Sequence, residues 1–556
     1  MLRKLSGGRL FDPTQGLNDV AQDLFIRDGW LVEDPGPDAQ VDEEIDVSGQ
    51  IVMAGAVDIH THVAGGNVNN ARRLMPQMQM KSSQHAKRVA GLPNPARGWS
   101  ATGTGHRYAC MGYTTVVEPA VLPCNALSAH LEMADIPILD TAGLAILGND
   151  ELLLGMLQAR APQSAINDYV AWTLDATRCL GIKVINAGGV NAFKSNAASF
   201  GLDDIVPMYG ISSREILQAL QRAVVQLGVN HPLHVHCNNL GVAGRSAETA
   251  VATMEAAEGM PMHLAHVQFY GYGEEGANAF SSASACLIDA WKRHPNVTMD
   301  VGQVLFGPTV TISSDVIAQF NNRAAANPKR AVFSMAECEG GGGVVPYVYR
   351  EQSFVNTLQW AIGLELFLLA DDPSRLFFTT DHPNGAPFTR YPELFRLLMD
   401  ADYRAEVMAT MNQDAIAMTL LPHLKREYSL YEIAIMTRSA AAGLMGLHDR
   451  GSLAPGHLAD VAVYAPQDDY AAMFRNVKAL FKSGVQVVKD GEVIASPPGR
   501  SLHALPDYDR SAADHRVADY YRQVMTISPQ NLGVANHFDG SEESAARFVE
   551  VATADA

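Results

Sequence analysis

The 556-residue chain carries 41 basic and 60 acidic residues, a formal net charge of −19, and its composition is 47% hydrophobic and 18% charged. These proportions are typical of a folded globular protein with a large apolar core, and they exclude a disordered chain. The acidic balance opposes contact with phosphate backbones and anionic lipid. Neither nucleic acid nor a membrane surface is therefore expected as a partner.

The six cysteines are scattered along the chain, and no Cys-x-x-Cys pair occurs. Disulfide scaffolds are small and dense in cysteine, so this pattern predicts a reduced, cytoplasmic protein. The N-terminal residues MLRKLSGGRLFD contain no apolar run typical of a signal peptide. No stretch approaches the ~18 consecutive apolar residues of a membrane span.

Both ends of the predicted globular region contain short strands punctuated by turns. LFIRDGWLV and EIDVSGQIVM lie near the N-terminus, and ADVAVYAP and VQVVKDGEVI lie far down the chain. Asp-Gly and Ser-Gly pairs are turn signals between such strands. We expect residues 1–55 and 440–505 to form one small, discontinuous β-sandwich domain.

Strands and helices alternate between these two regions. Strand-like runs such as AVDIHTHV, GIKVINAGG, PLHVHCN and RLFFTTDH alternate with helix-like runs such as SREILQALQRAVVQLG. This alternation predicts βαβ units and a parallel sheet. The length suits a (β/α)₈ TIM barrel over residues 56–439. Residues 506–556 are expected to form a C-terminal extension with one helix.

The sharpest local motif is Asp58-Ile59-His60-Thr61-His62, at the end of a predicted strand. Residues i and i+2 of a strand point to the same side. His60 and His62 could therefore direct two imidazoles at one ion. The competing interpretation is a chance pair or a structural hydrogen-bonded pair.

Further metal-binding side chains occur in other strand-like runs: His234, His236, His263, His266, Lys183, Asp381 and His382. The carboxyl ends of barrel strands converge on one face, so residues distant in sequence can share one site. Several imidazoles with a carboxylate suit zinc better than magnesium or calcium.

Each of these residues also has a structural interpretation. His234 and His263 could be core residues that orient a neighbour. His231 and His294 each precede a proline and are expected on surface loops. Lys183 could extend from a strand end into solvent, or, if buried beside cations, lose its charge and take up CO₂ as a carbamate.

At this point the chain resembles the amidohydrolase superfamily. MAGAVDIHTHVAGGNVNNARRLMP, TGHRYACMGYTTVVEPA, GIKVINAGGVNAF, HVHCNNLG, GGGGVVPYVYRE and TTDHPNGAPFTRYP carry the resemblance, and GSLAPGHLADVAVY is similar to the superfamily's return strand. Within the superfamily, these segments resemble the A subunits of formylmethanofuran dehydrogenases and of formyltransferase/hydrolase complexes.

The resemblance implies two Zn²⁺ ions per chain, bound by His60, His62, Lys183, His236, His266 and Asp381. His60 and His62 would bind the first ion, and His236 and His266 the second. Lys183 would bridge them as N6-carboxylysine, and Asp381 would hold the first ion and act as catalytic base. Whether His234 or His263 replaces His236 or His266 stays open.

The resemblance also implies a substrate and partners. The reaction would be hydrolysis of the formyl amide of formylmethanofuran, or of an analogue, to formate and the free amine. The chain would be one subunit of a formyltransferase/hydrolase-type complex. Asn69 and Arg72, in the glycine-rich loop after the metal histidines, and His382 are candidates for substrate contact. Gly340–Gly343 is a candidate lid.

Two alternatives remain open from the sequence. One is a hydantoinase- or dihydroorotase-like cyclic amidase with the same metals. The other is a scaffold subunit that has kept the barrel without catalysis. Such a scaffold would be expected to have lost ligands, whereas usable residues stand at all six positions.

Overall fold

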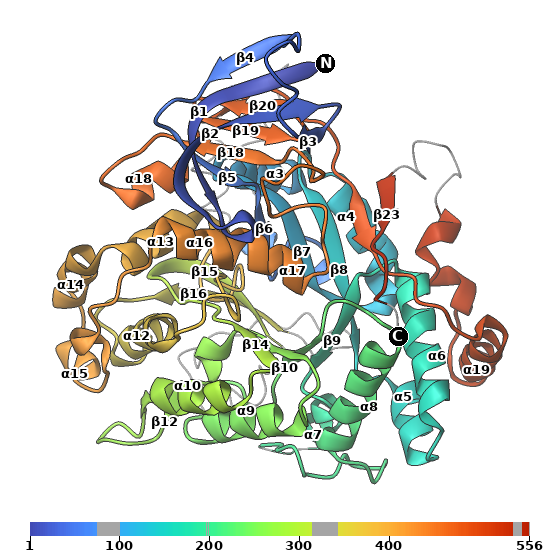
Figure 1. Ribbon diagram of the computed structural model, residues 1–556. Helices are drawn as coiled ribbons and strands as arrows, with labels where there is room; N and C mark the ends of the chain where they lie inside the picture. The colour runs from blue at the N-terminus through green and yellow to red at the C-terminus, as the bar shows by residue number, and fades with distance from the viewer. Residues whose placement is uncertain (75–99, 196, 198, 314–342, 538–546, 555–556) are drawn as a thin grey trace.

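The computed structural model describes residues 1–74, 100–195, 197, 199–313, 343–537 and 547–554. A small sheet lies at one end of a larger α/β barrel, and the C-terminal residues lie along one flank of the barrel (Figure 1). No helix among the described residues is long and apolar enough to cross a membrane. The five cysteines within these ranges are all free thiols.

The small sheet combines strands from both ends of the chain. It has nine strands in the order β21-β20-β19-β18-β5-β1-β2-β3, with β4 also paired to β1. The N-terminal strands are β1 (Leu2–Asp12), β2 (Leu17–Arg27), β3 (Trp30–Val32), β4 (Glu43–Asp46) and β5 (Ile51–Ala54). The later strands are β18 (Val461–Tyr464), β19 (Ala479–Lys482), β20 (Val485–Lys489) and β21 (Glu492–Val493).

The two ends meet where β18 runs antiparallel to β5, with Val461 opposite Ala54. Buried side chains from both ends, including Leu5, Val52 and Phe481, form a core separate from that of the barrel. The expected discontinuous β unit is therefore present, as one mixed sheet. Its boundaries at 1–55 and 440–505 stay a prediction.

The barrel consists of eight parallel strands among the described residues. They are β6 (Ala56–Asp58), β7 (Tyr113–Val121), β8 (Asp140–Leu147), β9 (Gly181–Ile185), β10 (Leu233–His236), β11 (Met262–Leu264), β14 (Val297–Asp300) and β17 (Leu376–Phe377). A parallel bridge between Thr61 and His382 joins the segments after the first and last strands. The predicted barrel class is confirmed.

Helices connect these strands around the barrel. The longer ones are α3 (Ala101–Cys110), α4 (Ala126–Ala134), α5 (Glu151–Gln158), α6 (Gln163–Thr177), α8 (Ser213–Gln226), α9 (Arg245–Ala256), α10 (Ser284–Arg293), α12 (Phe354–Leu369), α13 (Tyr391–Met399) and α14 (Ala401–Ala409). Shorter ones are α7 (Gly189–Lys194), α15 (Gln413–Ile416), α16 (Leu430–Ala434) and α17 (Ala440–Leu444). α18 (Tyr470–Arg475) lies between β18 and β19 of the small sheet.

Local sequence signals account for these strands and helices. The strand β9 reads Gly-Ile-Lys-Val-Ile, and its first four residues are buried, as expected for a parallel strand covered on both faces. The helix α8 begins with a capping box, in which Ser212 and Glu215 each accept from the other's backbone N–H. Such signals fix where strands end, and therefore where the side chains at their carboxyl ends lie.

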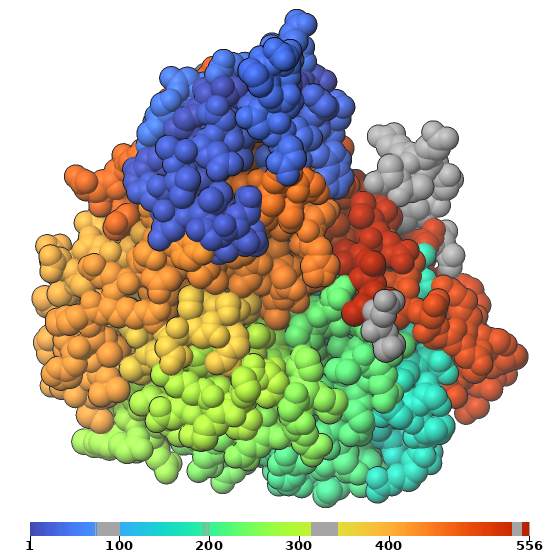
Figure 2. Space-filling model, viewed as in Figure 1, coloured from blue at the N-terminus to red at the C-terminus, as the bar shows by residue number. Residues whose placement is uncertain are grey.

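Two strands from the C-terminal part of the chain join the barrel sheet, one of them within the expected small β domain and one in the C-terminal extension. β22 (Ser501–His503) runs parallel to the first residues of β8, and β23 (Phe548–Glu550) pairs with β22. α19 (Arg510–Val524) lies against α6, where Trp172 Nε1 donates to Asp514 at 2.9 Å. Figure 2 shows these C-terminal residues in red against the flank of the barrel.

A cap lies beside the barrel mouth. It comprises α1 (Gly66–Leu74) and the antiparallel hairpin of β15 (Gly307–Ser313) and β16 (Gly343–Tyr349). Ala71, Val310 and Val344 form a small apolar core of their own between these elements. Of the candidate lid Gly340–Gly343, only Gly343 is among the described residues.

Candidate metal centre

The first two candidate ligands follow β6 directly and are held by a buried carboxylate beneath them. Asp58 accepts hydrogen bonds from the hydroxyls of Tyr108 (2.7 Å) and Tyr391 (2.6 Å) and from the His60 backbone N–H (3.1 Å). The His62 N–H donates to the His382 carbonyl at 2.8 Å, across the seam where the barrel closes. The turn carrying His60 and His62 is therefore fixed from both sides.

Asp381, after the last strand, faces both histidines. Its Oδ1 lies 3.1 Å from His60 Nε2 and 3.3 Å from His62 Nε2. Lys183 Nζ, from β9, lies 3.4 Å from the same His60 nitrogen. Asp381 and Lys183, from different strands, thus meet at the Nε2 edge of the His60 ring.

Two further histidines complete the cluster. Ligand atoms of His60, His266 and Asp381 all lie within 4.8 Å of one another, and all three residues are buried. The His236 ring centroid is 4.7 Å from that of His266, with the rings edge to face. The structure therefore brings together all six residues for which the sequence predicted metal binding.

Two atoms of this cluster have unmet hydrogen-bonding capacity. Within the described part of the chain, the buried His266 Nδ1 has no hydrogen-bond partner, and the buried Asp381 Oδ1 lies within ion-pair distance of His60 and His62 without a hydrogen bond to either. Both residues also hold left-handed backbone conformations, with φ of 50° for Asp381 and 37° for His266. Strain and unsatisfied polar atoms are costly in a core and cluster at functional sites. A donor set of imidazole and carboxylate with orphaned atoms fits a divalent metal of the zinc type.

Burial and charge set the protonation of the cluster. Burial lowers the pKa of Lys183 and takes the pKa of His266 well below its usual value. Burial alone would raise the pKa of Asp381, but the charges of His60 and His266 outweigh it and lower that pKa well below its usual value. A lysine whose charged form is disfavoured, beside the imidazole of His266 and the ionised carboxylate of Asp381, is a donor set suited to cations.

Two carboxylates that sequence reasoning missed orient these histidines. Glu118 on β7 accepts from His62 Nδ1 at 3.0 Å and from the backbone N–H groups of Val63 and Ala64. Asp300 at the end of β14 lies 3.0 Å from His60 Nδ1 and accepts the His266 N–H at 2.8 Å. With Nδ1 of His62 bound to Glu118 and Nδ1 of His60 bound to Asp300, the Nε2 atoms of both rings face Asp381. The available signal was an acidic residue inside an apolar strand, in TTVVEPA and NVTMD.

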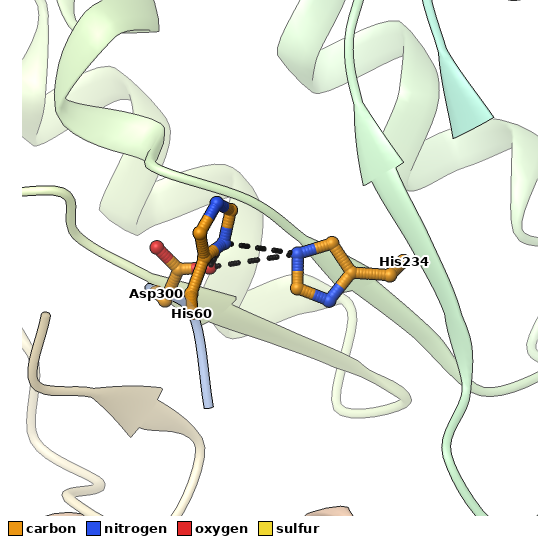
Figure 3. Close-up of side chains that lie close together, drawn as sticks. All are labelled: His60, His234 and Asp300. Carbon is orange, nitrogen blue, oxygen red and sulfur yellow. Dashed lines mark hydrogen bonds and ion pairs between the residues drawn. The ribbon is translucent and has the colours of Figure 1, made fainter. Parts of the chain in front are cut away.

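His234 and His263 lie on the other side of His60. Figure 3 shows His234 directed at His60 and Asp300, with Nε2 3.1 Å from His60 Nδ1. His263 Nε2 lies 3.1 Å from Asp300 Oδ2. These two imidazoles thus contact Asp300 and the Nδ1 edge of His60, whereas Asp381 and Lys183 lie at its Nε2 edge.

The expected surface position of His231 is wrong. The residue is buried; its Nε2 lies 3.1 Å from His234 Nδ1 and its Nδ1 lies 3.2 Å from the Leu444 carbonyl. The loop before β10 lies against α17, whose last residue is Leu444. Burial lowers the pKa of His231 to about 3, so its ring is neutral. His294 is partly exposed.

The predicted substrate residues lie beside His62. Arg72 on α1 donates to Asn69 Oδ1 at 2.9 Å and to the Val63 carbonyl at 2.8 Å, and Asn69 donates to Glu132 on α4. A cavity of about 20 Å³ is lined by His62, Val68, Ala71, Arg72, Thr104, His382 and Pro383. Arg72 and His382 thus line the cavity next to His62, a candidate metal ligand. Asn69 is linked to this cavity by its hydrogen bond with Arg72.

Comparisons with known proteins show the family of the chain. The amidohydrolase family model matches residues 43–495. The chain is 48% identical to the Fhc A subunit of the formyltransferase/hydrolase complex of Methylorubrum extorquens, over 94% of each chain. It is 34% identical to the protein FwdA of Methanocaldococcus jannaschii over 97% of each. It superposes on a chain of the crystal structure of the Methylorubrum extorquens FhcABCD complex with methylofuran, with a TM-score of 0.93, 45% identity and 100% of both chains covered.

An eight-stranded barrel with this donor cluster at its strand ends defines a class, the metal-dependent barrel hydrolases. The extent of the family match makes the assignment specific: the chain belongs to the amidohydrolase family. It is a hydrolase that acts on an amide bond.

Proposed function

We propose that the chain is a binuclear zinc hydrolase that releases formate from a formyl amide. His60, His62 and Asp381 would hold one ion and His236 and His266 the other, with Lys183 bridging both as N6-carboxylysine. The observation that carries the proposal is the convergence of these residues around Asp381 Oδ1, a buried acceptor with no hydrogen bond in the described structure.

The bound ions would supply an activated water and polarise the formyl carbonyl. Asp381 is the group placed to move protons. Its carboxylate is ionised and buried at the histidine cluster, so it can accept the proton of the attacking water and pass it to the leaving amine. Lys183 takes part only as the carbamate, because a neutral amine buried in this cluster is a poor ligand for bridging two ions.

The substrate we propose is formylmethanofuran or a methanofuran analogue. The support is the likeness, along nearly the whole chain, to the Fhc protein of Methylorubrum extorquens and to a chain solved in a complex with methylofuran. By the same argument, this chain works with other subunits of a formyltransferase/hydrolase-type complex, in the cytoplasm. Arg72 and His382 would contact the substrate from the cavity beside His62, with Asn69 holding Arg72.

Formate release tests the proposal directly. Purified protein is assayed on formylmethanofuran, with a hydantoin as the competing cyclic substrate, and zinc is counted in the same sample. We expect formate from the first substrate only and about two zinc ions per chain. Hydrolysis of the hydantoin instead, or a protein with neither metal nor turnover, would contradict the proposal.

The role of Asp381 is tested by Asp381→Asn, with Asp289→Asn on the exposed side of α10 as the matched control. The amide keeps the shape and one ligand oxygen but cannot take up a proton. Turnover should fall by about 100-fold or more while much of the zinc remains. Near-normal turnover in Asp381→Asn would remove this residue as the base.

A further inference from the structure

The carboxylate of Asp381 has two oxygen atoms in different surroundings. Oδ1 faces His60 and His62, whereas Oδ2 accepts a hydrogen bond from Asn384 Nδ2 at 2.9 Å. Asn384 is three residues further along the chain and is buried. Its backbone N–H also donates to the Asp381 carbonyl at 2.6 Å. A hydrogen bond therefore holds the Asp381 carboxylate on the side away from the histidines, while its other oxygen lies within ion-pair distance of His60 and His62.

The orientation of the Asn384 amide is fixed by its second neighbour. The backbone N–H of Ile312, on β15 of the cap, donates to Asn384 Oδ1 at 2.6 Å. A backbone N–H can only donate and a carboxylate can only accept. The amide therefore has a single arrangement that satisfies both, with oxygen toward β15 and nitrogen toward Asp381.

Two more contacts tie the cap to the same turn. Tyr349 on β16 donates from its hydroxyl to the Asn384 carbonyl at 3.0 Å, and Thr309 on β15 donates to the Pro383 carbonyl. Tyr349, Thr309 and Asn384 are all buried. Hydrogen bonds from both strands of the hairpin thus converge on the turn that carries Asp381.

We propose that Asn384 is a positioning residue that couples the β15–β16 hairpin to Asp381. The hairpin fixes the Asn384 amide, the amide fixes the rotation of the Asp381 carboxylate, and Oδ1 is thereby presented to the histidine cluster. The side-chain partners of Asn384 within the described residues are Asp381 and Ile312, so it acts through Asp381. The inference rests on the proposed role of Asp381 in metal binding and proton transfer.

The test compares Asn384→Ala and Asn384→Asp with Asn412→Ala, which removes an asparagine that caps the distant helix α15. Zinc affinity is measured by chelator competition, and kcat and KM are measured with formylmethanofuran at saturating zinc. Loss of one hydrogen bond to a charged group should lower kcat by about 10- to 100-fold with little change in KM. Zinc affinity should also fall, further in Asn384→Asp because like charges then face each other.

A link to the hairpin adds a second, independent readout. Ile312→Pro removes the N–H that orients the amide, so it should lower zinc affinity in the wild-type background and have a much smaller effect in Asn384→Ala. Equal effects in the two backgrounds, or zinc affinity and kcat of Asn384→Ala within about twofold of wild type, would overturn the proposal. If the wild-type protein binds zinc but releases no formate, the proposed function fails, while the zinc-affinity comparison still decides the role of Asn384.

Discussion

Replacing Asp300 with asparagine should weaken both the fold and the metal centre, by amounts that follow from its contacts. Asp300 Oδ2 lies 3.0 Å from His60 Nδ1 and 3.1 Å from His263 Nε2, and Oδ1 accepts the His266 N–H at 2.8 Å. Burial alone would raise the pKa of Asp300, but the charge of His60 and the hydrogen bonds with His263 and His60 outweigh it and lower that pKa.

Asparagine offers a single acceptor oxygen in place of two. If the amide oxygen faces the rings of His60 and His263, the NH₂ group faces the His266 N–H and that hydrogen bond is lost. If the amide oxygen faces the His266 N–H, neither ring has an acceptor. At least one charge-assisted hydrogen bond is lost in either case, in a fully buried position. The free energy of unfolding should therefore fall by about 2–4 kcal/mol. Zinc affinity should fall by about 10- to 100-fold, because His60 is no longer held in one tautomer.

Urea unfolding of metal-free protein measures the first quantity, and chelator competition measures the second. Asp289→Asn is the control, since Asp289 is exposed and should change unfolding by no more than about 0.5 kcal/mol. An Asp300→Asn variant that matches this control in both measurements would refute the orienting role of Asp300. A rise in zinc affinity would refute it as well, since Asp300 would then compete with the metal for His60.

Three other outcomes are expected. Lys183→Ala should lower metal content, with partial rescue by short carboxylic acids; full zinc loading and activity in this variant would remove the bridging carbamate. Burial lowers the pKa of His62, but the carboxylates of Glu118 and Asp381 outweigh burial and raise that pKa from 6.5 to about 9. The protonated His62 therefore stabilises the metal-free fold fully below about pH 6.5, and this stabilisation is lost as the pH rises through about 9. Thermal unfolding of metal-free protein should show this loss, and an unchanged pH dependence in Glu118→Gln would contradict the assignment to Glu118. Zinc uptake should release a proton from His62 at neutral pH, which calorimetry in buffers of different ionisation enthalpy would detect.

The gathering of candidate metal-binding residues at strand ends was predictable from local rules, whereas the choice of six ligands among them came from the resemblance to the amidohydrolase superfamily. His60 and His62 follow the strand β6 directly, and Lys183 and Asp381 lie in or directly after apolar runs typical of barrel strands. Convergence at one face then follows from parallel strand topology. These steps need no knowledge of how neighbouring strands are registered.

The orienting residues could not be assigned because their partners depend on that register. Asp300 reaches His60 because β14 and β6 both neighbour β17 in the closed barrel, and the predicted barrel class does not state which side chains then meet. His231 was misplaced for a related reason, since the proline after it indicates a loop but not that the loop lies against α17. The pairing of β22 with β8 consists of two residue pairs distant in sequence, too few for a periodic pattern.

An anomalous-scattering map at the zinc edge, from crystals of the metal-loaded protein, tests the paired-metal centre most directly. We expect two peaks at the barrel mouth, one contacting His60, His62 and Asp381 and the other contacting His236 and His266. Additional density on the Lys183 side chain, from its carboxylate group, should lie between the two peaks. A map with no peak there, or with an ion held between His234 and Asp300 instead, would contradict a binuclear centre at these residues.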